Sequence, residues 1–159
     1  MWAAAISNTS AGLHPGVDRL LGEMEIDWIF HCGNIGSNDV LVALSAHAPT
    51  TGVLGPKDDA SELPFRGHLV KTIEGCTIYV AEDIGTAIRP NDATARAIEA
   101  HSPKVVLFAG NGAPSVDVVG GVIWVSPGSS QSEGDECAVA ILELRGGQAH
   151  CEMVSVSAG

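Results

Sequence analysis

The chain has 159 residues, of which 45% are hydrophobic and 17% are charged, and its formal net charge is −11. This length predicts one domain over residues 1–159, long enough to bury a core without cross-links or a structural metal. The charge argues against nucleic acid and anionic membranes as partners, because binding to either normally requires clustered Lys and Arg side chains.

Predicted strands alternate with predicted helices over the first part of the chain. Apolar runs predict strands at residues 2–6, 27–31 and 51–54. Helical spacing of apolar residues predicts one helix that begins at Pro15 and a second at residues 38–47. This alternation favours parallel strands, whose polar loops would share the sheet edge at which ligands bind in such folds.

The second part of the chain is richer in hairpin signals. Residues 69–73 and 77–80 flank a Glu-Gly turn and predict an antiparallel pair. A polar N-cap and an alanine-rich body predict a helix at residues 91–99. Further predicted strands lie at residues 104–108, 116–119, 122–125, 138–144 and 150–156.

Short motifs follow the predicted strands in a fixed order. They are Ile-Ser-Asn-Thr-Ser at 6–10, His-Cys-Gly-Asn at 31–34, Gly-Pro-Lys-Asp at 55–58, Ile-Tyr-Val-Ala-Glu-Asp at 78–83, Val-Val-Leu-Phe-Ala-Gly-Asn-Gly-Ala-Pro at 105–114 and Ser-Pro-Gly-Ser at 126–129. Over nearly the whole chain, this order resembles the small bacterial phosphodiesterases of the calcineurin-like metallophosphoesterase superfamily. The family motifs are Ile-Ser-Asp-Thr-His, His-x-Gly-Asp, Gly-Asn-x-Asp, a strand ending in Thr-His-Gly, Val-Val-Ile-Phe-Gly-His-Thr-His-x-Pro and Asn-Pro-Gly-Ser.

The resemblance implies an α/β fold, an αββα four-layer sandwich of two mixed β-sheets flanked by helices. It also implies where metal ligands would stand. The family's metal-binding Asp, His, Asp, Asn, His, His and His correspond here to Asn8, Ser10, Asn34, Pro56, Glu82, Gly110 and Gly112. None of these positions keeps the ligand of the family.

These replacements bear directly on the chemistry. A two-metal phosphoesterase centre requires imidazole and anionic donors, including a carboxylate that bridges the two cations. An amide oxygen is a weak ligand for Mn, Zn or Fe, and glycine has no side chain at all. We therefore expect a degenerate pocket with no catalytic residue and no cofactor. The expected function is a catalytically inactive binding or scaffold module, like the retromer subunit that carries this fold for assembly. A protein partner or a second copy of the chain would bind it.

Two other functions stay open. Asp58, Glu82 and Asp83, with Asn8 and Asn34, would hold one divalent cation (Mn, Mg or Ca) in a remodelled phosphodiesterase or phosphoesterase, although such acids more often cap turns. Alternatively, the turn at residues 110–112 and the turn at 127–130 would bind a small anion through backbone amides, without a metal.

Several further residues have simpler interpretations. His31 ends a predicted strand beside the pocket, where a hydrogen-bonded core imidazole is favoured over a catalytic base. Trp2, Trp28 and Trp124 lie in predicted strands and are expected in the core, whereas an exposed tryptophan would suit a protein partner.

The cysteines and the apolar runs predict the cellular location. The spacing of Cys32, Cys76, Cys137 and Cys151 contains no Cys-x-x-Cys motif, so buried thiols are expected rather than a zinc site or a disulfide framework. No apolar run approaches the roughly 20 residues of a membrane helix. The start Met-Trp-Ala-Ala-Ala lacks a basic segment, which leaves a cytoplasmic location by elimination.

Overall fold

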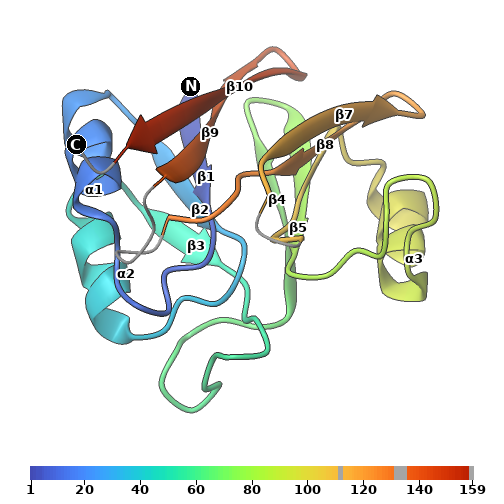
Figure 1. The fold of residues 1–159 in the computed structure, drawn as a ribbon. Helices are drawn as coiled ribbons and strands as arrows, with labels where there is room; N and C mark the ends of the chain where they lie inside the picture. Colours follow the sequence, from blue (N-terminus) through green and yellow to red (C-terminus); the bar gives the residue numbers. More distant parts are fainter. Residues whose placement is uncertain (111–112, 131–135, 158–159) are drawn as a thin grey trace.

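The protein folds into two five-stranded sheets packed face to face, with helices on both outer faces (Figure 1). The structure is a computed structural model and describes residues 1–110, 113–130 and 136–157. Within these residues, α1 (Pro15–Glu23) and α2 (Asn38–Ser45) cover the first sheet, and α3 (Asp92–His101) covers the second. The αββα sandwich of two mixed sheets expected from the resemblance is confirmed.

The first sheet has the strand order β10-β9-β1-β2-β3. β1, β2 and β3 run parallel, as the strand and helix alternation predicts, while β9 is antiparallel to both β1 and β10. The carboxyl ends of the three parallel strands therefore lie at one edge. The strands are β1 (Trp2–Ile6), β2 (Trp28–His31), β3 (Thr50–Gly52), β9 (Glu136–Arg145) and β10 (Gln148–Ser157).

The second sheet has the strand order β4-β5-β6-β8-β7. β4 and β5 form the predicted antiparallel pair, β5, β6 and β8 are parallel, and β7 is antiparallel to β8 at the edge. The strands are β4 (His68–Ile73), β5 (Cys76–Ala81), β6 (Val105–Leu107), β7 (Ser115–Val119) and β8 (Val122–Ser126).

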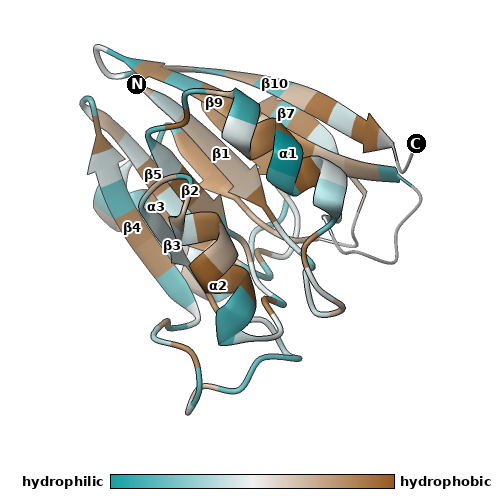
Figure 2. Ribbon diagram, turned by 90° about the vertical axis from the view of Figure 1, so that its left-hand side faces the viewer, coloured by the Kyte–Doolittle hydropathy of each residue, from teal (hydrophilic) through white to brown (hydrophobic). Residues whose placement is uncertain are grey.

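β1 lies at the centre of its sheet and is buried on both faces. Ala3 and Ala5 face the second sheet, whereas Ala4 and Ile6 face α1 and α2, and all four are 0% exposed. A strand covered on both sides reads as a continuous apolar run, and β1 is drawn in the hydrophobic colours in Figure 2. This burial fixes the point at which the first polar loop leaves the core.

The helix ends are set by side-chain and backbone hydrogen bonds. His14 caps α1 by accepting from the amide of Gly16 at 3.0 Å, and Asn91 caps α3 by accepting from Thr94 at 2.9 Å. The prediction that the second helix reaches residue 47 is wrong. The amide of His47 donates to Leu44 at 3.0 Å in a tightened last turn, and the His47 side chain binds Asp18 of α1 at 2.7 Å.

Other predicted boundaries shift by one or two residues. The strand predicted at 51–54 ends at Gly52. Val53 lies beyond it, where it forms an isolated bridge to Arg66 and its amide donates to the carbonyl of His31 at 3.0 Å. The strand predicted at 104–108 spans only Val105–Leu107. Within the described residues, no helix has the length and apolar character that crossing a bilayer requires.

The three tryptophans differ in exposure. Trp124 is 2% exposed, as expected of a core residue, and Trp28 is half-buried with the Nζ atom of Lys71 4.0 Å from its ring centroid. Trp2 is 42% exposed, so its expected place in the core is wrong. Cys32 and Cys76 are buried free thiols, and Cys151 is a half-buried one.

The edge strand β7 leaves apolar side chains uncovered. Val116 and Val118 pair with Val125 and Ile123 of β8 and share their face of the sheet, yet they are 41% and 70% exposed. Asp117 stands between them on the opposite face.

Packing between the sheets should dominate the stability of the fold. Leu107 of β6 is 0% exposed between the two sheets. We expect Leu107→Ala to lower the free energy of unfolding by about 3 kcal/mol, through lost burial and the cavity that remains. Urea denaturation measures the loss. The matched change Val42→Ala, at a side chain that is 62% exposed, should cost less than about 0.5 kcal/mol. Equal losses in the two variants would contradict this account of the core.

Candidate functional site

The loops that follow β1 and β2 are tied together by their backbones. The amide of Asn8 donates to the carbonyl of Gly33 at 3.1 Å, and the amide of Thr9 donates to the carbonyl of Asn34 at 2.8 Å. Asn8 and Asn34 both adopt left-handed backbone conformations, with φ of 55° and 59°. Asparagine tolerates this region better than most residues, because its short polar side chain bonds locally.

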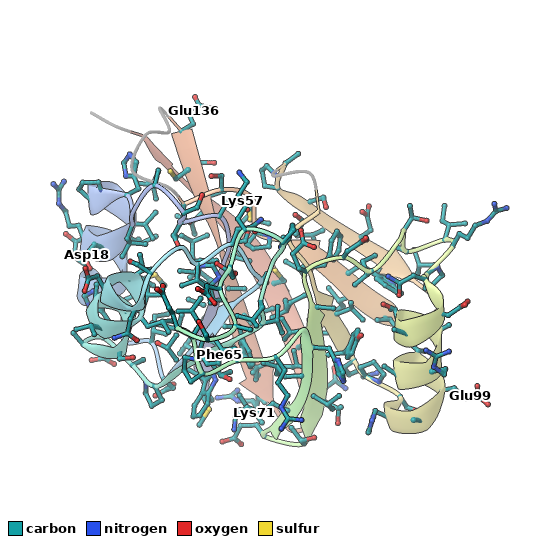
Figure 3. All side chains as sticks on the ribbon, turned by 90° about the horizontal axis from the view of Figure 1, so that it is seen from below. Asp18, Lys57, Phe65, Lys71, Glu99 and Glu136 are labelled. Carbon is teal, nitrogen blue, oxygen red and sulfur yellow. The ribbon has the colours of Figure 1, made fainter. Side chains whose placement is uncertain are left out.

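The side chains of Asn8 and Asn34 bond directly to each other. Nδ2 of Asn34 donates to Oδ1 of Asn8 at 3.1 Å, and Oδ1 of Asn34 accepts from the amide of Lys57 at 3.2 Å. A backbone amide can only donate, so the contact with Lys57 fixes which end of the Asn34 side chain carries oxygen. Asn34 thus joins three loops while it is only 9% exposed. In Figure 3, Lys57 lies between the side of the molecule that carries α1 and α2 and the side that carries α3.

Gly55 is needed for the close approach of the third loop. A Cβ atom at Gly55 would lie 2.7 Å from the backbone nitrogen of Asn34, and it would also contact the side chain of Asn34. The two asparagines and Gly55 therefore form one packed, uncharged unit.

The three carboxylates of the alternative metal site do different work. Asp58 accepts from the amide of Gly36 at 3.0 Å and from that of Gly55 at 2.8 Å. Asp83 accepts from the amide of Gly85 at 2.9 Å. Asp83 therefore caps its own loop, whereas Asp58 caps its own loop and also ties it to the loop after β2.

Glu82 differs from the two aspartates. Its carboxylate has no hydrogen-bond partner within the described part of the chain. Its side chain lies against Gly33, where a Cβ atom would come within 2.8 Å of the Cγ atom of Glu82. Burial raises the pKa of Glu82, and the nearby charges of Asp83 and Asp58 raise it further. Glu82 thus joins the second sheet to the loop after β2.

A cavity of 680 Å³ opens beside this contact. Pro56, Glu82 and Gly110 border it, so three of the seven positions carried over from the family lie around one space. Asp83 and Asp117 add carboxylates to the wall, together with Phe108 and the loop at residues 85–87. We call this space the acidic cavity.

The remaining positions lie elsewhere. Asn8 and Asn34 are not part of the wall of the acidic cavity, and Ser10 is exposed where its backbone packs against Gly36. Gly112 and Asn111 fall outside the described residues. Sequence reasoning missed Asp117 and Phe108. The available signal for Asp117 was a charged residue between valines in a predicted strand.

His31 is a buried, neutral imidazole. Its Nδ1 accepts from the amide of Gly33 at 3.1 Å, and its Nε2 lies 2.9 Å from Oγ1 of Thr9. The Thr9 hydroxyl donates its proton to the carbonyl of Ile35 at 2.8 Å, so Nε2 must be the donor to Thr9. Burial lowers the pKa of His31 to about 4, against a smaller opposing effect of Asp58. The predicted structural role fits all of these contacts.

The side chains at these positions do not fit the two-metal centre that the resemblance implies. Two amides, a hydroxyl, a proline, one carboxylate and a glycine stand at the described positions. Across residues 1–110, 113–130 and 136–157, no three His, Cys, Asp or Glu side chains form a group suited to holding a metal ion. Neutral amides would leave the charge of two dications uncompensated.

Most of the chain is similar to one known family of domains. The family model of the calcineurin-like phosphoesterase superfamily domain matches residues 5–147. Vps29 from Chaetomium thermophilum is 15% identical, with 100% of each chain covered and a TM-score of 0.76. The same protein has also been solved in complex with a RaPID-derived cyclic peptide.

Two further solved structures share the fold. Vps29 from Entamoeba histolytica, complexed with Zn²⁺, is 18% identical, covering 98% of this chain and 99% of its own, with a TM-score of 0.69. A novel archaeal phosphodiesterase is 13% identical, covering 97% of this chain and 100% of its own, with a TM-score of 0.73. No curated protein matches the sequence.

The buried imidazole makes stability depend on pH. The pKa of His31 is about 4 in the folded chain, against 6.5 when unperturbed, so between these values the unfolded chain binds more protons and stability falls as the pH is lowered. We expect His31 to account for a loss of about 2 kcal/mol between pH 7.5 and pH 5. Urea unfolding of the wild type and of His31→Gln at both pH values measures this loss. An equal pH dependence in the two proteins would contradict the neutral buried imidazole.

Proposed function

Because the chain belongs to the calcineurin-like phosphoesterase superfamily, we propose that it is a catalytically inactive binding or scaffold module of that fold. The hydrogen bond between the Asn8 and Asn34 side chains carries the proposal. The resemblance puts metal-binding aspartates of the enzymes at both positions. Here a neutral donor meets a neutral acceptor, so the hydrogen bond holds the two loops together and no cation is needed to balance charge.

Three other polar groups of the region are engaged in structural contacts. Asp58 and Asp83 accept from backbone amides, and His31 holds both of its ring nitrogens in hydrogen bonds. A nucleophilic water requires a metal or a general base, and none of these three groups is free to act as that base. Glu82, whose carboxylate has no hydrogen-bond partner within the described residues, is the candidate base that remains to be tested.

A remodelled phosphodiesterase is the chief competing function. The Zn²⁺ complex of Vps29 from Entamoeba histolytica and the archaeal phosphodiesterase make it worth testing. In this chain, one Mn, Mg or Ca ion held by Asp58, Glu82 and Asp83 would have to displace three amide contacts of the two aspartates. Hydrogen bonds to charged groups contribute about 1.5–3 kcal/mol each, which disfavours this arrangement.

The third possibility is a metal-free site for a small anion, at the position where the resemblance places the metal centre of the enzymes. Glu82, Asp83 and Asp117 border the acidic cavity, and their negative charges would repel such a ligand. The wall of this cavity therefore argues against an anion as its occupant.

A protein partner, or a second copy of the chain, is the ligand class we favour. Trp2 is 42% exposed and lies beside Met1, which is 45% exposed. An exposed tryptophan is a common anchor in protein interfaces. The cyclic-peptide complex of Chaetomium thermophilum Vps29 gives a precedent for binding by this fold. A reducing, cytoplasmic location would suit the free thiols of Cys32, Cys76 and Cys151.

Metal content and turnover test the proposal directly. The purified protein should hold no stoichiometric Mn, Zn, Fe or Ni by elemental analysis, because the described positions offer too few anionic donors. It should also leave an aryl phosphodiester intact in the presence of added Mn²⁺. Turnover that is abolished by Glu82→Ala but retained in Glu62→Ala, a change at an exposed loop residue, would establish the remodelled enzyme instead.

Restoring charge at the amide pair tests the observation that carries the proposal. In the double variant Asn8→Asp, Asn34→Asp, two carboxylates would meet where the amide atoms lie 3.1 Å apart. Their repulsion, up to about 4 kcal/mol, raises the folded-state pKa of the pair, so stability should be lost as the pH rises. Thermal unfolding at pH 5 and pH 8 measures the loss, and Mn²⁺ should reverse it.

The single variant Asn34→Asp is the matched control. Rotation of the Asn8 amide lets its nitrogen donate to the new carboxylate, so the pH effect should be smaller. If Mn²⁺ raised the unfolding temperature of the wild type as much as that of the double variant, the proposed loss of metal binding would be wrong.

A further inference from the structure

A second cavity lies between α3 and the first two strands of the second sheet. Its volume is 300 Å³, and it shares no wall residue with the acidic cavity. His68 and Tyr79 border it from β4 and β5, and Arg96 and His101 border it from α3. We call this space the helix cavity.

The strand register and the helical spacing explain why these side chains meet. Tyr79 pairs with Val70, so both point to the face that α3 covers, and His68 lies on the same face two residues away. The His68 and Tyr79 rings have centroids 6.4 Å apart. On α3, Ala97 lies on the face that lines the cavity, next to Arg96. Its small side chain leaves space that a larger residue would fill.

The charge of the helix cavity is opposite to that of the chain. The chain has 19 acidic and 8 basic residues, yet no Asp or Glu borders this cavity. Arg96 forms no ion pair within the described residues. The labelled carboxylate of α3, Glu99, points away from the sheets in Figure 3. Arg96 is exposed at the rim of the cavity, and its guanidinium group is therefore open to a ligand.

Tyr79 adds a polar group to the wall of the cavity. The residue as a whole is only 2% exposed, and its hydroxyl group forms no hydrogen bond within the described part of the chain. The hydroxyl oxygen is not among the buried side-chain atoms that lack a partner, so it reaches solvent. The hydroxyl group can therefore donate to a ligand in the cavity without breaking a contact within the described residues.

We propose that the helix cavity binds a small organic carboxylate. The planar guanidinium group of Arg96 matches the two oxygens of a carboxylate, and the Tyr79 hydroxyl and the imidazoles of His68 and His101 add donors. Val70 and Ala97 provide an apolar surface for the body of the ligand. A volume of 300 Å³ lies at the lower end of ligand cavities, which sets a small size. This cavity is separate from the acidic cavity, and the inference does not rest on the proposed function.

Titration of the intact protein with benzoate, followed by the NMR signals of its backbone amides, tests the proposal. We expect saturable shifts at residues 68–70 and 93–101. Arg96→Gln should weaken binding at least about tenfold, because a bidentate charged contact is lost, and Tyr79→Phe should weaken it by about threefold. Arg19→Gln removes the same charge from an exposed position on α1 and should leave the affinity unchanged.

Three outcomes would overturn the proposal. The first is a benzoate titration that never saturates, and the second is an equal affinity in Arg96→Gln and Arg19→Gln. The third is tighter binding of inorganic phosphate than of benzoate, which would show that the apolar wall contributes nothing. Urea midpoints of all variants, compared with that of the wild type, establish that the changes act on binding and not on folding.

Discussion

The contact between the loops after β1 and β2 is the constraint on which the rest of the site depends. Both strands end at the same edge of the sheet. The loop after each strand then turns at an asparagine with a left-handed backbone conformation, so Asn8 and Asn34 lie face to face. Their hydrogen bond is neutral, and the buried His31 beside it is neutral as well. Nothing in this unit calls for a cation to balance charge, because backbone and amide hydrogen bonds already hold the loops together.

Much of the fold follows from local patterns, because buried parallel strands and capped helices leave clear signals in the sequence. β1 reads as an apolar run since both of its faces are covered, and Asn91 marks the start of α3 through its cap. The sequence favoured capping roles for Asp58 and Asp83, and the structure confirms them, but the amides that they accept from were not foreseen. Whether a carboxylate binds a metal or a backbone amide depends on where Gly36, Gly55 and Gly85 present their N–H groups, and residue spacing does not specify that.

The two cavities beside the second sheet could not be predicted from the sequence, because their walls depend on how distant elements pack. Each combines side chains from elements far apart in the chain: Asp117 of β7 joins Glu82 in one, and Arg96 of α3 joins Tyr79 in the other. A net charge of −11 describes the whole surface and hides this division. One sheet thus carries a cavity that attracts cations and another that suits anions.

The exposed edge strand β7 affects how copies of the protein meet in solution. A strand edge with uncovered valines is a template on which another chain can add a strand, and Val118 is 70% exposed there. Asp117 places a negative charge in the middle of β7, and two copies of the chain, each with a net charge of −11, repel each other. Salt shortens the range of that repulsion to about 10 Å at 0.1 M. Charge repulsion therefore opposes strand pairing between copies at β7, and this protection weakens as the ionic strength rises.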